Sequence, residues 1–324
     1  MIAFAGMSFG ILILIVGGTV LVQGATQGGT RMGLSPMVVG LTIVGFGTSA
    51  PELVISIIAA VQNQTDLVFG NVVGSNIANL SFVLGIAALL MPIQIHGQLV
   101  RRELPLLLLG TTVIMVMALD DLLRGAPATI DRSDALILLL LFCILFYVTA
   151  TDMMKNKHAD QLMSDIRSNP LIVTDWKARY WWLLIIAGIG LLFVGGRMTV
   201  DNGVALAEGL GVSSTVIGLF ALAIGTSLPE LITSIVAAMR GESDLAVGNV
   251  VGSNIFNGLF VLPISALVKA VEVPTGGIGD LLLSWVFAGL LIPIFFFGNA
   301  RLGRPVGAII LMVYFLYFAA RLMV

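Results

Sequence analysis

The sequence has few charged residues and little cysteine or histidine. Charged residues make up 10% of its 324 positions, against about a quarter in ordinary soluble domains. Hydrophobic residues make up 58%, so water cannot be the main solvent of this chain. The basic residues form no dense run and the net charge is −2, which argues against nucleic acid as a partner. The single cysteine, Cys143, has no partner for an intrachain disulfide or a thiolate metal site.

The chain also lacks a polar interval long enough to form a soluble domain. The longest interval, from Asp152 to Arg179, is far shorter than an independently folding domain. No basic residue precedes the first apolar stretch, so we expect a membrane helix there and no cleaved signal peptide. Apolar stretches of about 20 residues, the length that crosses a bilayer, recur along the chain. We predict an all-α integral membrane protein with ten transmembrane helices, at about 7–27, 36–61, 67–91, 103–120, 134–152, 180–206, 213–239, 245–269, 279–298 and 304–322.

Lysine and arginine are distributed unequally between the two sides of the predicted membrane region. Four lie on the side of the even-numbered loops, namely Arg124, Arg132, Lys269 and Arg321. Eleven lie in the loops after the odd-numbered spans: Arg31, Arg101, Arg102, Lys155, Lys157, Arg167, Lys177, Arg179, Arg240, Arg301 and Arg304. Cytoplasmic loops carry the excess of basic residues. We therefore expect a multi-pass protein of the cell (inner) membrane with both termini outside the cytoplasm and the 153–179 connector inside.

An internal repeat is the strongest signal in the sequence. Gly47-Thr-Ser-Ala-Pro-Glu52 returns as Gly225-Thr-Ser-Leu-Pro-Glu230, and Gly70-Asn-Val-Val-Gly-Ser-Asn76 returns as Gly248-Asn-Val-Val-Gly-Ser-Asn254. The offset is 178 in both cases, 225 − 47 and 248 − 70. Five predicted spans separate equivalent positions, and because five is odd, the second copy enters the membrane from the opposite side. We predict two inverted five-helix repeats, 1–152 and 180–324, which is the architecture of many secondary transporters.

Glu52 and Glu230 occupy equivalent places deep inside apolar spans. A charged side chain at such a place costs on the order of 3 kcal/mol. The two motifs contain no basic residue at equivalent positions, so a bound cation is the natural counter-charge, and two carboxylates match a divalent ion. The alternative is that both glutamates are protonated and only hydrogen-bond between helices.

Pro51 and Pro229 precede the two glutamates. A proline inside a helix leaves the carbonyl four residues earlier, at Gly47 or Gly225, without its hydrogen bond. We therefore predict broken helices at the membrane midplane. Their free carbonyls are hard oxygen ligands suited to sodium and calcium.

Hydroxyl and amide side chains accompany the glutamates. Thr48 and Thr226 lie four residues before the glutamates, on the same helix face. The following span carries a stripe with a spacing of four, formed in the two copies by Asn71, Ser75 and Asn79 and by Asn249, Ser253 and Asn257. We favour ion contact for Ser75, Asn79, Ser253 and Asn257. Two roles, ion contact or joining of helices, stay open for Asn71, Asn76, Asn249 and Asn254.

One charged pair lies inside a predicted span without a counterpart in the other repeat. Arg197 and Asp201 are spaced i, i+4 and can neutralise each other. The equivalent residues in the first repeat, Thr19 and Gln23, are uncharged. We expect a structural ion pair.

At these motifs the sequence resembles the calcium/cation antiporter superfamily, and specifically the compact prokaryotic sodium/calcium exchangers. The likeness covers essentially the whole chain and implies sodium and calcium ions as the transported partners. It implies a calcium site formed by Glu52, Glu230, Thr48 and Thr226, with backbone carbonyls near Gly45 and Ala223. It implies sodium sites that draw on Ser49, Ser75, Ser227 and Ser253.

The resemblance also distinguishes subtypes. In several family members, including the potassium-dependent exchangers, the residue four positions after the second-repeat serine is aspartate, whereas this sequence has Asn257, matching Asn79. We therefore expect potassium-independent, electrogenic exchange. The proton-coupled branch carries a Gly-Asn-Ala-Xaa-Glu core that is absent here. Antiport of protons against calcium, or of another divalent cation, is the alternative.

Two other classes of function fit less well. A sodium-coupled symporter of an organic solute would need a group to hold the solute, and paired glutamates suit a small cation better. An intramembrane hydrolase would need a nucleophile with a base or a metal motif, and no histidine lies near the motif serines. We expect a transporter and not an enzyme, with no cofactor and no obligate protein partner.

Overall fold

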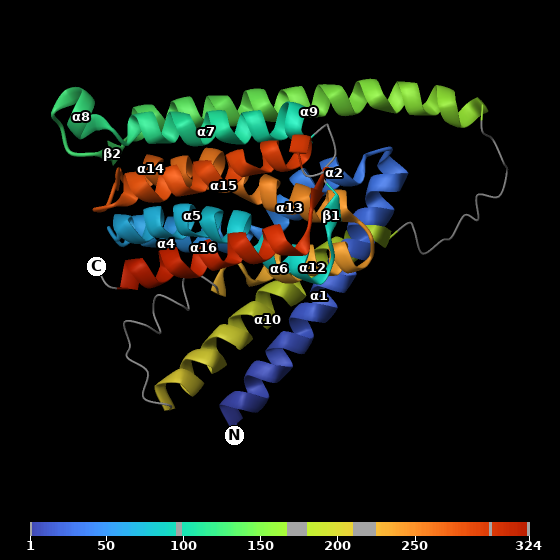
Figure 1. Ribbon diagram of the computed structural model, residues 1–324, viewed down its shortest axis with the longest axis horizontal. Coiled ribbons are helices and arrows are strands. Elements are labelled where there is room, and N and C mark those ends of the chain that lie inside the picture. Colours follow the sequence, from blue (N-terminus) through green and yellow to red (C-terminus); the bar gives the residue numbers. More distant parts are fainter. Residues whose placement is uncertain (1, 95–98, 167–179, 210–224, 298–299, 323–324) are drawn as a thin grey trace.

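The computed structural model describes residues 2–94, 99–166, 180–209, 225–297 and 300–322, and helices make up its framework (Figure 1). The first half contains α1 (Ile2–Met32), α2 (Pro36–Val39), α3 (Gly45–Thr48), α4 (Ala50–Val61), α5 (Thr65–Ala78), α6 (Leu84–Leu90), α7 (Leu104–Met117), α8 (Asp120–Arg124) and α9 (Arg132–Ile166). The second half contains α10 (Trp181–Gly209), α12 (Leu228–Met239), α13 (Ser243–Phe256), α14 (Leu262–Val268), α15 (Gly277–Phe297) and α16 (Arg304–Leu322). Four π-helical turns adjoin these helices in the described residues: η1 (Gly40–Val44), η2 (Asn79–Val83), η3 (Leu99–Glu103) and η5 (Asn257–Val261).

Long apolar helices identify an integral membrane protein, as predicted. Within the described residues, seven helices are long and apolar enough to cross a membrane, or eight if the bent pair Pro36–Thr48 and Ala50–Val61 forms one span. These correspond to eight of the predicted spans. At the predicted span 103–120, α7 has only 14 residues and η3 precedes it. At the predicted span 213–239, only the part that includes α12 lies within the described residues.

The elements themselves recur at the offset of the sequence repeat. Ala50–Val61 returns 178 residues later as Leu228–Met239, and Thr65–Ala78 returns as Ser243–Phe256. The π-helical turn η2 and helix α6 likewise return as η5 and α14. Equivalent sequences therefore fold into equivalent local structures in both halves of the chain.

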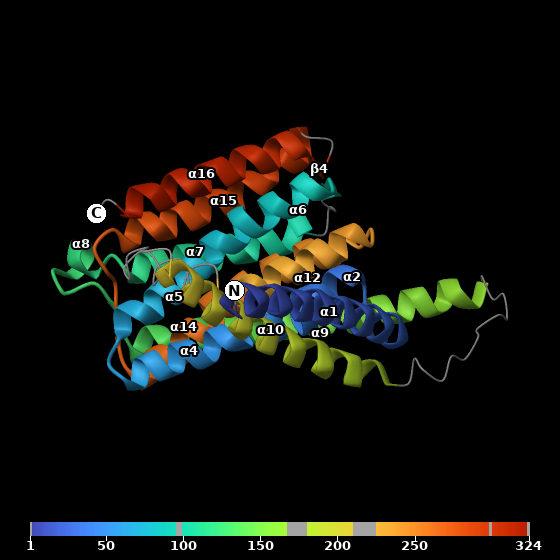
Figure 2. The same ribbon diagram turned by 90° about the horizontal axis from the view of Figure 1, so that it is seen from below.

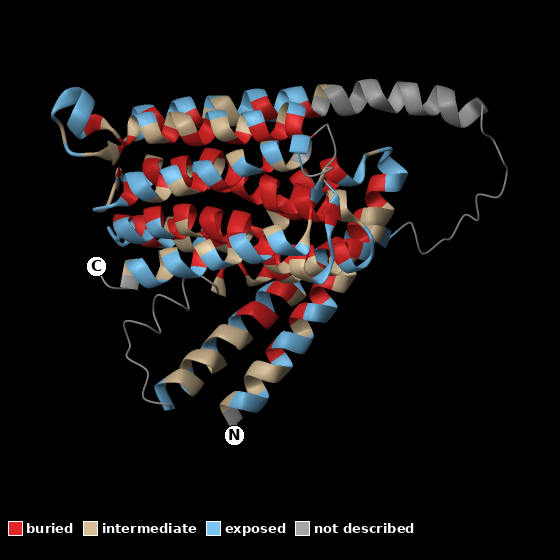
Figure 3. Ribbon diagram, viewed as in Figure 1, coloured by how far each residue is buried: buried red, intermediate tan, exposed pale blue. Residues whose placement is uncertain are grey.

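The core is formed by the helices that carry the second motif of each repeat. In α5–η2–α6 and α13–η5–α14, 78% and 83% of the most apolar window is buried, whereas α1 and α10 bury 33% and 28% (Figure 3). α1 and α10 lie side by side at the edge of the bundle (Figures 1 and 2). Their backbones touch: a Cβ atom on Gly188 would lie 2.6 Å from the Leu21 nitrogen, and one on Gly195 would lie 2.7 Å from the Leu14 nitrogen. Only glycine permits this approach.

Two short antiparallel ribbons connect loops of different halves, and the prediction of helices alone missed them. β1 (Ile93–Gln94) pairs with β4 (Arg301–Leu302), and β2 (Thr129–Ile130) pairs with β3 (Val271–Glu272). Each strand buries one apolar residue, namely Ile93, Leu302, Ile130 and Val271. Strands of two residues carry too little periodicity to be recognised in a sequence.

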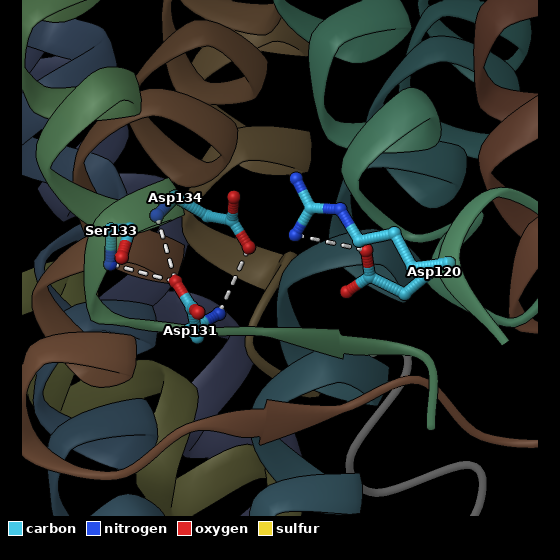
Figure 4. Close-up of polar contacts among 5 residues, drawn as sticks. Asp120, Asp131, Ser133 and Asp134 are labelled. Carbon is cyan, nitrogen blue, oxygen red and sulfur yellow. Dashed lines mark hydrogen bonds and ion pairs between the residues drawn. The ribbon is translucent and has the colours of Figure 1, made fainter. Parts of the chain in front are cut away.

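Helix α9 begins with a capping box (Figure 4). Asp131 Oδ1 accepts hydrogen bonds from the Ser133 and Asp134 nitrogens at 2.7 and 3.0 Å, and Asp134 Oδ2 accepts one from the Asp131 nitrogen at 3.1 Å. The hydrogen bond from the Asp134 backbone lowers the pKa of Asp131. The helix continues to Ile166, so the first part of the predicted 153–179 connector is helical. Residues 152–166 contain neither glycine nor proline to end it.

Candidate functional site

A break in one helix and the start of another place the repeated motifs in the interior. α3 ends at Thr48 and α4 begins at Ala50, with a bend of 42° between the two segments. Pro51 lies in the first turn of α4, where its missing N–H costs no helical hydrogen bond. Ser227 adopts nearly the same backbone angles at the start of α12 as Ser49 does at the start of α4. The first motif is thus a broken helix, as predicted, and in the second copy the residues before Gly225 lie outside the described part.

Glu52 and Glu230 lie in the first turns of α4 and α12, and both are 0% exposed. The free N–H groups of a first turn favour negative charge. Glu230 Oε1 accepts hydrogen bonds from Ser49 Oγ at 3.0 Å and from Ser253 Oγ at 3.4 Å. In contrast, the Glu52 carboxylate interacts with the Thr226 hydroxyl and with its own backbone N–H. Within the described residues the hydroxyl of Ser227, the counterpart of Ser49, has no hydrogen-bond partner. The two glutamates are close enough to interact electrostatically, and none of the ion pairs among the described residues includes either of them.

Hydroxyl groups connect the two repeats symmetrically around these carboxylates. Thr48 Oγ1 lies 3.3 Å from Ser253 Oγ, and the equivalent Thr226 Oγ1 lies 3.2 Å from Ser75 Oγ. Ser253 Oγ also lies 3.2 Å from the carbonyl oxygen of Gly45. Each first motif therefore faces the second motif of the other repeat. Ala223, for which the resemblance implies a carbonyl ligand, lies outside the described residues.

Asn79 and Asn257 begin the π-helical turns η2 and η5. Both side chains are 0% exposed, and neither amide group has a hydrogen-bond partner in the described part of the chain. Single π-helical turns are frequent at functional sites because they displace a backbone segment and its side chain. Among the described residues, these two amides are thus buried polar groups that no internal hydrogen bond satisfies.

The other asparagines join helices through their amide nitrogens, which is one of the two roles that the sequence left open. Asn71 Nδ2 donates to the Glu52 carbonyl at 3.2 Å and to Ser56 Oγ at 2.9 Å. The second repeat has the same arrangement, in which Asn249 Nδ2 donates to the Glu230 carbonyl and to Ser234 Oγ. Asn76 and Asn254 donate to each other's carbonyls. Ser56 and Ser234 were not predicted, although their offset of 178 is a signal that would have identified them.

The ligand set suits exchangeable binding of a hard cation. It consists of two carboxylates and several neutral hydroxyl, amide and carbonyl oxygens, which are the ligands that calcium and sodium prefer. Among the described residues there is no group of three or more His, Cys, Asp or Glu side chains. With two carboxylates, such a site would carry a small charge, which would allow a bound ion to leave again.

Two cavities lie between α4 and α10 and extend to the site. The larger has a volume of about 520 Å³ and is lined by Val54, Gly196 and Thr226, among others. The smaller has a volume of about 300 Å³ and includes Thr48 and Pro51 in its wall. The equivalent contact in the other half, between α1 and α12, is closed. A Cβ atom on Gly18 would lie 3.0 Å from Ile232 Cγ2, where Gly18 is the counterpart of Gly196 and Ile232 that of Val54 at the 178-residue offset.

Comparison with known proteins gives a consistent result. Residues 2–151 and 180–323 match the sodium/calcium exchanger protein family. The chain is 37% identical to the inner membrane protein YrbG of Escherichia coli K12 over 84% of its own length and 82% of the relative's. It is 28% identical to the sodium/calcium exchanger MaX1 of Methanosarcina acetivorans, over 96% of both chains. A structure of the sodium-calcium exchanger NCX_Mj, soaked with Na⁺ and Sr²⁺, superimposes with a TM-score of 0.82 at 26% identity and covers 98% of each chain. The chain belongs to the sodium/calcium exchanger family and is a membrane antiporter of cations, not an enzyme.

Proposed function

We propose that this protein exchanges sodium for calcium across the cell membrane by alternating access, and that the exchange is electrogenic and independent of potassium. The observation that carries the proposal is the pair of fully buried glutamates, one from each repeat, surrounded by hydroxyl groups. Two negative charges without a basic partner suit one divalent ion, and the alternative is that both acids are protonated.

Calcium is proposed to bind between Glu52 and Glu230, with oxygens from Thr48 and Thr226. The sodium ligands are proposed to be Ser49, Ser75, Ser227 and Ser253, with the amides of Asn79 and Asn257. Two carboxylates cannot stabilise three sodium ions and one calcium ion together in a low-dielectric cluster. Sodium and calcium therefore occupy the site in turn, which is the requirement for exchange.

The repeats support alternating access. We infer ten spans in two inverted halves, residues 1–152 and 180–324, joined by the 153–179 connector. In this arrangement the contact between α10 and α4 is the inverted counterpart of the contact between α1 and α12. The first contact holds the 520 Å³ cavity and the second is closed. Exchanging these two arrangements would close one approach to the glutamates and open the other, and α1 and α10, in glycine-mediated contact, would move as a unit.

Location and orientation follow from the charge bias. The excess of basic residues after odd-numbered spans places both termini outside the cytoplasm. Under this orientation the large cavity, which lies beside the second half of α10, opens to the outside. A relative named as an inner membrane protein supports the inner membrane as the location.

Sodium-driven calcium uptake into proteoliposomes tests this function. Vesicles loaded with sodium should take up calcium when diluted into sodium-free medium, and an imposed proton or potassium gradient should not replace sodium. Uptake driven by protons alone would favour the proton-coupled alternative.

The dependence of calcium efflux on membrane potential provides a second test. If three sodium ions enter as one calcium ion leaves, one net positive charge moves inward. That charge is worth roughly 2.3 kcal/mol per 100 mV, or nearly a fiftyfold change in the equilibrium calcium ratio. An inside-negative potential should accelerate sodium-dependent calcium efflux, and an inside-positive potential should slow it. A calcium efflux rate that does not change with the membrane potential would mean electroneutral exchange.

A further inference from the structure

An exposed ion pair lies on α10 in the wall of the larger cavity. Arg197 Nε is 3.6 Å from Asp201 Oδ2, and the two side chains are 75% and 67% exposed. Both line the cavity together with Gly225 and Thr226. Charged residues within membrane helices face water-filled spaces because hydrocarbon cannot solvate them. The open cavity therefore supplies the hydration that this pair requires.

The mirrored position in the first repeat shows what closure would do to this pair. Arg197 follows Gly196, whose counterpart Gly18 is packed against Ile232 in the closed contact. The counterpart of Arg197 is Thr19, which is partly buried. Closing the cavity in the same way would remove part of the water around the guanidinium group, at a cost that a threonine does not carry.

A second polar residue also differs from its counterpart in the other repeat, but this one lies on a helix of the closed contact. Thr233 on α12 is 0% exposed, and its hydroxyl has no hydrogen-bond partner among the described residues. Its counterpart at the offset of 178 is Ile55, an apolar residue that lines the open cavity. At the 178-residue offset, Thr233 thus takes on α12, beside Ile232 of the closed contact, the place that Ile55 takes on α4 in the wall of the open cavity. A buried hydroxyl without a partner is destabilising, and opening the α1–α12 contact would hydrate it.

We propose that the Arg197–Asp201 pair and Thr233 are opposed polar residues that set the balance between the two access states. The ion pair stabilises the state described here, in which the α4–α10 cavity is open. Thr233 stabilises the alternate state, in which the α1–α12 contact opens. The inference deepens the proposed alternating access and rests on it. It assigns the asymmetry of the transporter to residues outside the repeated motifs.

One labelling experiment tests both the ion pair and Thr233. Ile232→Cys, in a Cys143→Ser background, is to be labelled in everted membrane vesicles by an impermeant thiol reagent, which reaches it when α1 and α12 separate. Replacing Arg197 and Asp201 by their counterparts, as R197T/D201Q, should raise the labelling rate by roughly threefold or more. T233V, which deletes the hydroxyl at nearly constant volume, should lower the rate by a similar factor. The combined variant should label at close to the rate of the parent, because the two effects oppose each other.

Controls keep the test specific. R197K retains the charge and should label like the parent. Removing a different i, i+4 pair, that of Arg124 and Asp120 on α8 (Figure 4), should leave the rate unchanged. Size-exclusion profiles exclude variants that do not fold. Equal rates in the two test variants, or shifts in the same direction, would overturn the inference.

Labelling needs no transported ion, so the two proposals can fail separately. If sodium-driven calcium uptake is present and neither variant changes the labelling, the inference is wrong and the exchange function stands. If uptake is absent and the rates shift in opposite directions, the proposed function fails and the two-state balance stands.

Discussion

Replacing either buried glutamate by glutamine is the sharpest perturbation of the proposed site. E52Q and E230Q keep the side-chain volume and remove one of the two negative charges. Glutamine at position 230 retains an oxygen that can accept from Ser49 and Ser253, and glutamine at position 52 retains one that can accept from Thr226. We therefore expect both variants to fold. Removing a buried charge should leave their stability without calcium equal to that of the parent or higher.

The expected loss of calcium binding is large. Two unit charges about 4 Å apart interact by about 4 kcal/mol at an effective dielectric constant near 20, and a divalent ion doubles this to about 8 kcal/mol. Dehydration of the ion and the carboxylate offsets part of that energy. If only half of it remains, the loss of about 4 kcal/mol corresponds to about a thousandfold weaker binding. Calcium transport at micromolar concentrations should then be nearly abolished.

Two measurements check this prediction. Calcium uptake by proteoliposomes measures transport, and the shift of the thermal unfolding midpoint with added calcium measures binding without transport. E272Q, which neutralises an exposed glutamate on β3, should behave like the parent in both. Flux at the parental level in E52Q or E230Q would refute the assignment of the site.

The remaining predictions concern the buried amide, the helix cap and the topology. N257D adds a carboxylate to a fully buried position and should change the ion preference or make transport sensitive to potassium or pH, with N79D as its matched counterpart; an unchanged ion profile would count against an ion-lining role. D131A removes the cap of α9 and should lower unfolding stability by about 1 kcal/mol. The pKa of Asp131 is lowered in the folded state, so the ionised carboxylate contributes to folding stability above the ordinary aspartate pKa of about 4. This contribution is lost as the pH falls through the folded-state pKa. A pH-independent difference between the parent and D131N in thermal unfolding would contradict this. S164C, in a background without Cys143, should resist impermeant thiol reagents on intact cells and react after permeabilisation, and labelling from outside would reverse the proposed orientation.

The repeat made much of the framework predictable. Two motifs with one offset located Glu52 and Glu230, and the structure finds both buried beside the hydroxyl groups that the stripe of spacing four indicated. Apolar length predicted most spans, because the bilayer imposes a minimum length on every crossing helix. The roles of the two glutamates and the neighbouring hydroxyl residues as ion ligands remain predictions.

Other features depend on contacts that no local pattern encodes. The ribbons of β1 with β4 and β2 with β3 join segments far apart in the chain, and each strand has only two residues. α9 continues past the apolar stretch to Ile166 because nothing in that polar segment ends it. The role of Asn71 and Asn249 in joining helices required the positions of Ser56 and Ser234.

The two copies of the first motif show most clearly where local sequence stops deciding structure. Their Gly-Thr-Ser-Xaa-Pro-Glu sequences are nearly identical, yet Ser49 donates to Glu230 while Ser227 has no partner in the described residues. The difference must come from the surroundings, and α1 and α10 differ there: α1 is packed on α12, and α10 is separated from α4 by a cavity. For an exchanger this division is useful. In the proposed mechanism, matched residues in the two repeats would let one site serve both sides of the membrane, while unmatched residues outside the motifs, such as Arg197 and Thr233, would shift the balance between the two access states.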